Sequence, residues 1–287
     1  MLKLGKIIGK GSDGEVYEIE NDKNKVVKYI QCSNYGIKNY LEFYIINNIK
    51  HENINTALSV DICDNGLVKI LQQKAISDLN RKIPIKKFKK IFYQSVKGLK
   101  YLNDMGIIHG DVKPSNMLLF EKDIVKYTDF SLSRLYTNNI NGHICSYFYR
   151  APEINKGIIE PSKIDVFSLG CSMYEVYFNE PYFNREHNIH FKKKSTQNTE
   201  KLLSLIYNMT NPNYKLRYNL DDVSKDDYFK NMNFNCDKYQ IILDPYFDNN
   251  DIIFNKCNNE KEFIGKFLDI DKSLKQDFNF NIFKKKY

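Results

Sequence analysis

The chain has 287 residues with a net charge of +8, and 42% of its residues are hydrophobic and 14% aromatic. This composition is typical of a soluble globular protein with ample apolar side chains for a core. No apolar run of roughly eighteen residues is present and the first dozen residues lack a long apolar segment, so neither a membrane span nor a secretory leader is expected.

The cysteines and the charge restrict the function further. The six cysteines are scattered without a C-x-x-C pair, which argues against a zinc site and for reduced thiols in an intracellular protein, cytoplasmic or nuclear. The lysines occur in scattered runs such as residues 192–194 and 284–286, which is typical of a solvated surface. No specific nucleic-acid partner is therefore expected.

The first predicted element is a strand, a glycine turn and a second strand over residues 4–20. Gly9, Gly11 and Gly14 form a G-x-G-x-x-G pattern, with Val16 two residues later. Glycine lets the backbone approach a phosphate closely. Because the sequence after Gly14 alternates like a strand and does not open a helix, the pattern favours a hairpin that covers phosphates over a dinucleotide-binding turn. Alone, this pattern is a weak signal.

Three predicted strands and a helix follow this hairpin. A β-branched strand at residues 25–30 carries Lys28, and apolar residues at helical spacing predict a helix over residues 38–50, which carries Glu42. Residues 56–75 contain two more strand-like runs around a turn at residues 64–66. Together these elements predict a small five-stranded lobe.

An amphipathic helix is predicted from Ile85 to Gly106, and it leads into the loop His-Gly-Asp-Val-Lys-Pro-Ser-Asn at residues 109–116. This loop places the carboxylate of Asp111, the ammonium group of Lys113 and the carboxamide of Asn116 close together. Such groups could serve a hydroxyl, a phosphate and a metal ion, although Asp, Pro, Ser and Asn are also ordinary turn formers.

Four later segments supply the context for this loop. Asp129 begins the run D-F-S thirteen residues after Asn116, a spacing at which a hairpin can bring both oxygen ligands to one cation. Residues 145–153 read C-S-Y-F-Y-R-A-P-E and residues 165–171 read D-V-F-S-L-G-C. A final helical run at residues 202–206 leads to Arg217.

In this order, the segments resemble the motifs of eukaryotic protein kinases, namely G-x-G-x-x-G-x-V, H-R-D-x-K-x-x-N, D-F-G, A-P-E and D-V-W-S-L-G-C. The resemblance covers residues 4–229. It implies an α+β, two-lobed protein kinase fold with a small five-stranded antiparallel lobe and one helix at residues 4–74, and a larger, mostly helical lobe at residues 75–229. Residues 230–287 carry none of these motifs and are expected to form a C-terminal extension, as a small helical cap or a partly ordered tail.

The resemblance implies a serine/threonine protein kinase that uses ATP and Mg²⁺ to phosphorylate protein substrates. Asp111 and Lys113 would be catalytic, and Asn116 and Asp129 would bind the metal. Lysine at position 113 goes with Ser/Thr acceptors in the family. The expected ATP-binding residues are Ile8, Gly9, Lys10, Gly11, Ser12, Asp13, Gly14, Glu15, Val16, and Lys28 in an ion pair with Glu42. Three further assignments rest only on counting residues along the family pattern: Gln72 as gatekeeper, residues 73–75 as hinge and Asp78 as a ribose contact.

The family pattern also predicts contacts around the loop. Ser146 should contact Asp111 and Lys113, and Arg217 should pair with Glu153. Asp165 should hold the backbone of the loop, although an N-capping role is compatible with the sequence. The form Y-R-A-P-E resembles the CMGC group, but only 36 residues separate Pro181 from Arg217, too few for the insert of that group.

Besides Phe167, which replaces the tryptophan of D-V-W-S-L-G-C, three residues depart from the family pattern. Asp13 replaces an aromatic residue at the tip of the glycine loop. Gly110 replaces the arginine that would pair with an activation-loop phosphate, so activity is not expected to require that phosphorylation. Ser131 replaces the glycine of D-F-G, and its Cβ predicts fewer inactive conformers or a somewhat strained active one.

The main alternative is a pseudokinase that binds partners without transferring phosphate, and it remains open because a fold never guarantees activity. Against it, all five residues whose loss would usually mark a pseudokinase are present: Lys28, Glu42, Asp111, Asn116 and Asp129. A small-molecule phosphotransferase would generally lack the A-P-E segment. The protein substrate and any activator subunit are left open.

Overall fold

The computed structural model describes residues 2–11, 14–31, 37–62, 67–135, 145–157, 160–183 and 197–233. The described residues belong to two compact units. The first unit takes its described residues from positions 2–50 and 55–74, and the second from positions 51–54 and 75–233. No helix in this described part combines the length and the apolar character that a membrane span requires.

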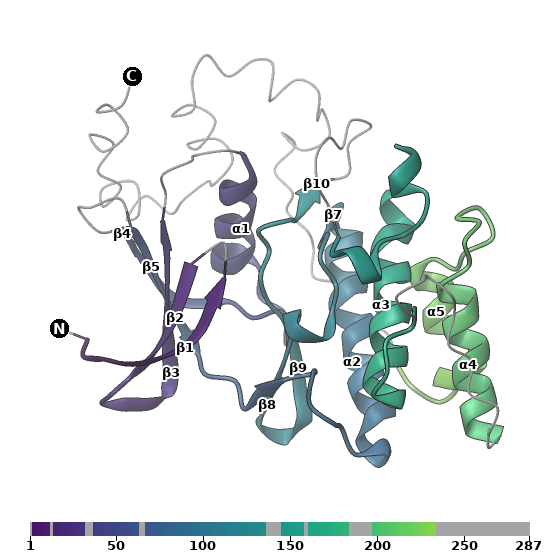
Figure 1. Cartoon of the computed structure of the whole chain (residues 1–287), viewed down its shortest axis with the longest axis horizontal. Helices are drawn as coiled ribbons and strands as arrows, with labels where there is room; N and C mark the ends of the chain where they lie inside the picture. Colours follow the sequence, from purple (N-terminus) through teal and green to yellow (C-terminus); the bar gives the residue numbers. More distant parts are fainter. Residues whose placement is uncertain are drawn as a thin grey trace. The chain divides into compact units, whose positions relative to one another are not determined.

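The first unit is an antiparallel sheet with one helix, as the sequence predicts (Figure 1). The strand order is β1-β2-β3-β5-β4. Its core comes from buried residues of β3 and β5, such as Val27 and Ile70, and from Leu41, Ile45 and Ile46 of α1. The elements are β1 (Leu4–Gly11), β2 (Gly14–Ile19), β3 (Asp22–Gln31), α1 (Ile37–Asn48), β4 (Ala57–Ile62) and β5 (Leu67–Gln73).

The second unit is mostly helical, with two small antiparallel sheets in the orders β6-β8-β9 and β10-β7. Its helices are α2 (Ile85–Asp104), α3 (Pro161–Phe178), α4 (Gln197–Met209) and α5 (Leu220–Lys225). Its strands are β6 (Ser77–Asp78), β7 (Ile107–Ile108), β8 (Met117–Phe120), β9 (Ile124–Tyr127) and β10 (Arg134–Leu135), and the short helix η1 spans Pro114–Asn116. This architecture confirms the fold class predicted from the sequence.

Helix α2 buries the apolar face that its sequence predicts. The residues of this face are all at most 2% exposed: Phe88, Ile91, Phe92, Val96, Leu99 and Leu102. The helix ends at Asp104, and Gly106 follows in the left-handed conformation (φ 70°), which glycine adopts without steric cost after a helix. The chain then passes directly into β7 and the loop that carries Asp111.

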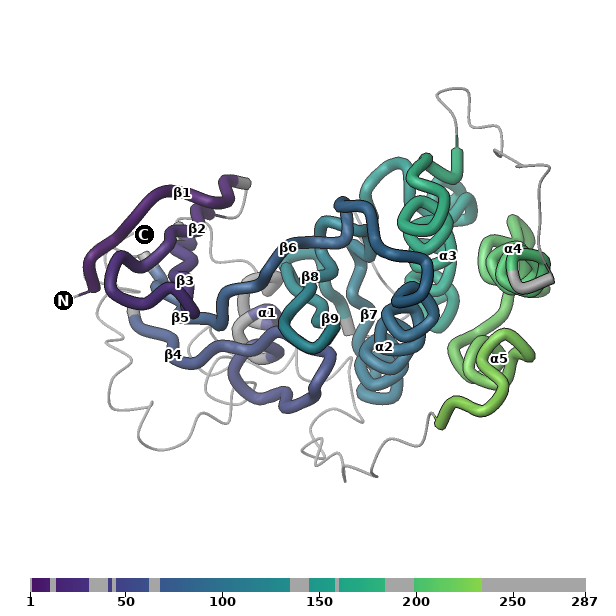
Figure 2. The backbone as a smooth tube through the Cα atoms, turned by 90° about the horizontal axis from the view of Figure 1, so that it is seen from below, coloured from purple at the N-terminus to yellow at the C-terminus, as the bar shows by residue number. Residues whose placement is uncertain are grey.

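Helix α3 is apolar around most of its circumference because it lies in the interior of the second unit. It lies beside α2 and α4 (Figure 2), and it also contacts β7, which precedes the Asp111 loop, and η1, which ends that loop. Twelve of its residues are buried, among them Asp165, Ser168 and Ser172. Since these polar side chains are inside the unit, they need hydrogen-bond partners there. These partners include backbone groups of the loops that form the candidate site, as well as carbonyl oxygens of α3 itself.

Candidate active site

The glycine segment forms the predicted hairpin between β1 and β2. Gly9 lies opposite Val16, and Gly11 lies opposite Gly14 at the end of the ladder. Gly14 has a φ of 142°, and a Cβ built on it would lie 2.0 Å from the carbonyl oxygen of Tyr29. This position therefore requires glycine. Ser12 and Asp13, at the tip, lie outside the described residues.

Charged side chains flank the end of this hairpin. Lys10 and Glu15 are cross-strand partners, and their Nζ and Oε1 atoms are 2.7 Å apart. The Tyr17 hydroxyl also donates to Glu15. Hydrogen bonds from Lys10 and Tyr17 lower the pKa of Glu15. Ile8, the first residue of the expected nucleotide-binding set, is exposed on β1.

Lys28 and Glu42 form the ion pair that the sequence predicts. Lys28 lies in the middle of β3, between its partners Val16 on β2 and Ile70 on β5. Its Nζ atom is 3.0 Å from Oε1 of Glu42 on α1, and the two side chains are only 16% and 5% exposed. The pair thus fixes an ammonium group on the strand next to the glycine hairpin.

The Asp111 loop begins directly after β7, and α3 holds its backbone. The Asp165 carboxylate accepts hydrogen bonds from the backbone N–H groups of His109 (2.7 Å) and Gly110 (3.0 Å), which confirms the predicted role of Asp165. The N-capping alternative is wrong, because α3 begins at Pro161 with Glu160 as its N-cap. Burial raises the pKa of Asp165 and these hydrogen bonds oppose the shift.

Gly110 adopts a conformation that a larger residue would adopt only with strain. Its φ is 78°, and a Cβ at this position would lie 2.3 Å from the carbonyl oxygen of Leu132. Its own carbonyl oxygen accepts a hydrogen bond of 2.6 Å from the N–H of Cys145. The glycine therefore lets the Asp111 loop approach the backbone of both the D-F-S segment and the A-P-E segment.

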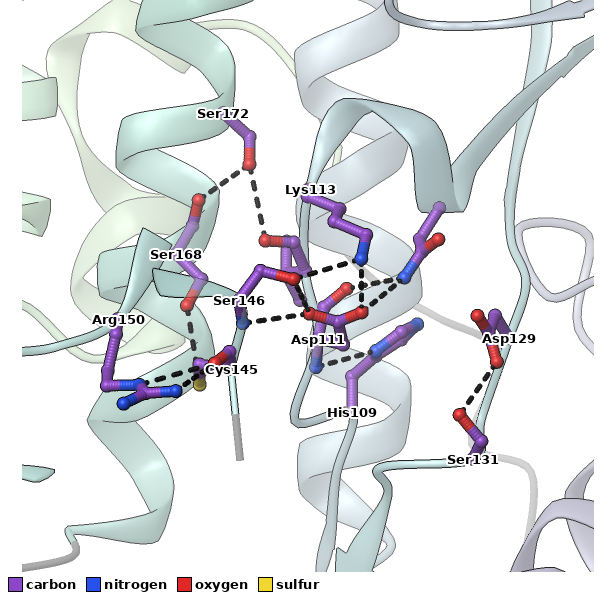
Figure 3. Close-up of polar contacts among 12 residues, drawn as sticks. His109, Asp111, Lys113, Asp129, Ser131, Cys145, Ser146, Arg150, Ser168 and Ser172 are labelled. Carbon is purple, nitrogen blue, oxygen red and sulfur yellow. Dashed lines mark hydrogen bonds and ion pairs between the residues drawn. The ribbon is translucent and has the colours of Figure 1, made fainter. Parts of the chain in front are cut away.

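The carboxylate of Asp111 is the centre of the site (Figure 3). Its Oδ1 atom accepts from the N–H (3.0 Å) and the hydroxyl (2.7 Å) of Ser146. Its Oδ2 atom lies 2.7 Å from Nζ of Lys113 and accepts from Nδ2 of Asn116 at 2.9 Å. Lys113 also donates to the Ser146 hydroxyl at 2.9 Å, so the predicted contacts of Ser146 with both residues are confirmed.

The protonation state of Asp111 follows from these contacts. Burial alone would raise the pKa of its carboxyl group. Hydrogen bonds from Lys113 and Ser146 outweigh this effect and hold the pKa below its ordinary value. Asp111 is thus a carboxylate at neutral pH and an acceptor only.

The side chains of Asn116 and Asp129 offer the oxygen ligands that Mg²⁺ prefers. Asn116 donates its amide N–H groups to the backbone oxygen and to Oδ2 of Asp111, both at 2.9 Å, which leaves its carbonyl oxygen as an acceptor. The N–H of Thr128, next to Asp129, donates to the backbone oxygen of Asn116 at 3.0 Å. The structure therefore brings both chain segments together, and their donor set fits a magnesium ion.

The D-F-S segment itself has an unusual backbone at Asp129, whose φ is 61°. Ser131 is not among the residues with positive φ, so the strain predicted for a side chain at this position is not found in its backbone. The Ser131 hydroxyl instead donates to Oδ1 of Asp129 at 2.9 Å. Phe130 is buried and packs against the ring of His109.

His109 has a structural role that sequence reasoning did not assign. Its ring is fully buried between Tyr127 and Phe130, with ring centroids 5.3 and 5.1 Å away. Burial lowers its pKa, although Asp165 and the other acidic groups act in the opposite direction, so the ring is neutral. Its carbonyl oxygen accepts from the Ser133 hydroxyl at 2.9 Å. His109 thus joins the Asp111 loop to the D-F-S segment.

The A-P-E segment is fixed by a buried ion pair. Both carboxylate oxygens of Glu153 accept from the guanidinium group of Arg217, at 2.6 and 2.8 Å, which confirms the predicted pair. Nearby, the Tyr149 hydroxyl donates to Glu175 of α3 at 2.7 Å, and Ser168 of α3 donates to the carbonyl oxygen of Tyr149.

Asn53 is a second residue that sequence reasoning missed. Residues 51–54 belong to the second unit, within the range 4–74 expected for the small lobe. Asn53 is buried and donates to the carbonyl oxygen of Val125 (2.8 Å) and to Gln94 (3.2 Å). Its backbone carbonyl oxygen accepts from the N–H of Tyr127. It therefore supports β9, the strand that leads to Asp129.

The residues expected at the hinge lie in two different units. Gln72 is buried in β5 of the first unit, and Lys74 pairs with Glu18 of β2 at 2.7 Å. Asp78 lies in β6 of the second unit and accepts from the N–H of Asn80. The gatekeeper, hinge and ribose assignments stay predictions.

Comparison with known proteins identifies the class. The model of the family described as protein kinase domain matches residues 2–273, nearly the whole chain, so the chain belongs to the protein kinase family. Its curated relatives include mitogen-activated protein kinases: the kinase HOG1 of Candida albicans is 31% identical over 58% of this chain and 46% of its own length. The kinase mpkC of Aspergillus fumigatus is 31% identical with the same coverage. The chain thus spans about half the length of these relatives, and their names agree with the CMGC-like Y-R-A-P-E segment.

Proposed function

We propose that the chain is a serine/threonine protein kinase that transfers the γ-phosphoryl group of Mg²⁺-bound ATP to hydroxyl groups of protein substrates. The observation that carries the proposal is the arrangement around Asp111, whose carboxylate is ionised, oriented by Asn116 and Ser146, and in contact with Lys113. Relatives named mitogen-activated protein kinases support a protein substrate with a Ser or Thr acceptor.

Asp111 and Lys113 carry the reaction in this proposal. Asp111 accepts the proton of the acceptor hydroxyl or orients its oxygen in line with the γ-phosphorus. Lys113 offsets the negative charge on the phosphoryl group as it moves. The 2.7 Å contact between Lys113 and Asp111 supports these roles, because it fixes the ammonium group beside the carboxylate.

Residues 8–16 and Lys28 bind the nucleotide in this proposal. The glycine hairpin covers the phosphates, and Lys28 contacts the α- and β-phosphates because Glu42 holds its side chain. Asn116 and Asp129 hold Mg²⁺, which neutralises charge on the β- and γ-phosphate oxygens when bound. The domain bounds of 4–229, with an extension at 230–287, stay predictions.

Gly110 bears on how the kinase is regulated. An arginine at this position would supply a cation for a phosphate on the activation loop, and glycine supplies none. We therefore propose that activity does not depend on such a phosphorylation. Treatment of the active protein with a phosphatase should leave its turnover unchanged, and a loss of most of the activity would contradict this part of the proposal.

The test of the enzyme is transfer of γ-labelled phosphate in the presence of Mg²⁺, with casein, histone and myelin basic protein as acceptors. We expect acid-stable label on serine or threonine, and no label with the Asp111→Asn variant. If the wild-type protein gives no more label than this variant while it still binds ATP, the proposed kinase activity is wrong and the pseudokinase alternative is favoured.

A further inference from the structure

Asp129 has one hydrogen-bond partner among the described residues, and it is a residue that most family members could not provide. The hydroxyl of Ser131 donates to Oδ1 of Asp129 at 2.9 Å (Figure 3). The family has glycine at this position, which carries no side chain. The donor in the D-F-S segment is therefore a property of this chain, and it acts directly on a carboxylate proposed to bind metal.

The backbone on both sides of Asp129 is already fixed without this bond. On one side, the N–H of Thr128 donates to the backbone carbonyl oxygen of Asn116. On the other, Phe130 is 1% exposed, and its carbonyl oxygen accepts from the N–H of Ser133. What remains to be ordered is the side chain of Asp129, which is partly exposed.

A hydrogen bond to a carboxylate is stronger than one between neutral groups, and it restricts the rotation of the side chain. With Oδ1 bonded to Ser131, the other oxygen of Asp129 has a defined direction before any metal arrives. Outer partners of this kind orient carboxylate ligands in metal sites, and their loss commonly weakens metal binding by roughly 10- to 100-fold.

We propose that Ser131 is a positioning residue for the metal, which orients the Asp129 carboxylate and thereby raises the affinity of the nucleotide site for Mg²⁺. This inference rests on the proposed function, because it takes Asp129 as a metal ligand. It assigns the effect to the hydroxyl of Ser131 and not to its Cβ.

The test compares variants that separate the hydroxyl from the Cβ. Ser131→Ala removes only the hydroxyl, Ser131→Gly removes both, and Ser131→Thr keeps both. Ser162→Ala is the matched control, because the Ser162 hydroxyl donates to Glu160, also a carboxylate two residues earlier, at the same distance of 2.9 Å. The readout is the Mg²⁺ concentration at which each protein reaches half-maximal binding of a non-hydrolysable ATP analogue in a calorimetric titration.

We expect Ser131→Ala and Ser131→Gly to require about tenfold more Mg²⁺ than the wild type. Ser131→Thr and Ser162→Ala should behave like the wild type. The affinity for the analogue in the absence of Mg²⁺ should be the same in all five proteins. A variant that had lost structure generally would show a lower affinity even without Mg²⁺. In turnover, the two weakened variants should recover the wild-type kcat at saturating Mg²⁺.

Two results would overturn the inference, and only the second would also overturn the metal role in the proposed function. If the wild type binds the analogue more tightly with Mg²⁺ and Ser131→Ala responds to the same Mg²⁺ concentrations, the hydroxyl does not orient the ligand and only this inference is wrong. If the analogue binds to the wild type equally with and without Mg²⁺, the metal role of Asn116 and Asp129 in the proposed function is wrong as well.

Discussion

Glu153 and Arg217 are 64 residues apart in the sequence, and yet their carboxylate and guanidinium groups form two parallel hydrogen bonds in the interior of the second unit. The Arg217 side chain is fully buried and that of Glu153 is 2% exposed. The pair therefore connects the A-P-E segment to the loop before α5, where no solvent can replace either partner.

Breaking this pair should destabilise the protein strongly. Glu153→Gln leaves the Arg217 charge buried without its counter-ion, and we expect a loss of about 3–5 kcal/mol in the free energy of unfolding. Urea denaturation measures this loss. Glu52→Gln is the control, because it removes the ion pair with Lys97, whose Nζ lies 2.7 Å from Oε1 of Glu52. Since the Glu52 side chain is 60% exposed, this change should cost no more than about 1 kcal/mol. Equal losses in both variants would contradict the prediction.

Gly110→Ala should cost more than an ordinary glycine replacement. The new Cβ would lie 2.3 Å from the carbonyl oxygen of Leu132, and the alanine would have to keep a φ of 78°. We expect a destabilisation of about 3 kcal/mol, the sum of a left-handed backbone and a steric overlap. Gly157→Ala isolates the first part, since Gly157 has a φ of 71° and no atom within 4 Å of a Cβ, and should cost about 1 kcal/mol. The prediction fails if the two variants unfold at the same urea concentration.

Glu42→Gln should reduce phosphoryl transfer, because it removes the counter-ion that positions Lys28. The variant keeps the shape of Glu42 but removes the charge that holds Lys28 at 3.0 Å. Since displacement of a positioning group by about 1 Å can cost roughly a hundredfold, we expect a fall of about that size in kcat/KM. Asp61→Asn removes an exposed pair with Lys69 on the same sheet and should leave kcat/KM unchanged. A Glu42→Gln enzyme with wild-type kcat/KM would show that the pair is not needed for transfer.

Asp111 should contribute to the acid sensitivity of the fold. Its pKa is below the ordinary value in the folded state, so the folded protein binds fewer protons than the unfolded chain near the unfolded pKa of about 3.9. Its contribution to stability is therefore complete above this pH and is lost as the pH falls through the folded pKa. Between pH 6 and pH 3, the wild type should lose more stability than Asp111→Asn. Parallel losses in chemical denaturation at each pH would contradict the direction of this pKa shift.

The sequence predicted the elements and contacts that depend on local patterns. The glycine hairpin, the apolar face of α2 and the pairs Lys28–Glu42 and Glu153–Arg217 follow from spacing and from motif order, and each is present in the structure. The ends of the helices predicted at residues 38–50 and 85–106 differ by at most two residues from those of α1 and α2, because the last turn of a helix depends on its capping contacts and not on periodicity. Helix α4 is longer at both ends than the run predicted at residues 202–206.

Other contacts could not be predicted because they join distant parts of the chain through groups without a distinctive pattern. Asn53 supports β9 through backbone oxygens, which carry no sequence signal. The hydroxyl of Ser131 is visible in the sequence, but its direction depends on the left-handed backbone at Asp129. The Tyr149–Glu175 contact likewise joins residues 26 positions apart in the sequence.

The four donors around Asp111 mean that its carboxylate has no idle lone pair in this arrangement. A substrate hydroxyl that approaches Asp111 must compete with the hydroxyl of Ser146, which belongs to the same chain and so has a high effective concentration. A free water molecule has no such advantage and does not displace the Ser146 hydroxyl from Asp111. A peptide that is anchored elsewhere on the surface has a high effective concentration of its own and can displace it. Competition with the Ser146 hydroxyl would thus favour phosphoryl transfer to anchored acceptors over hydrolysis of ATP by water.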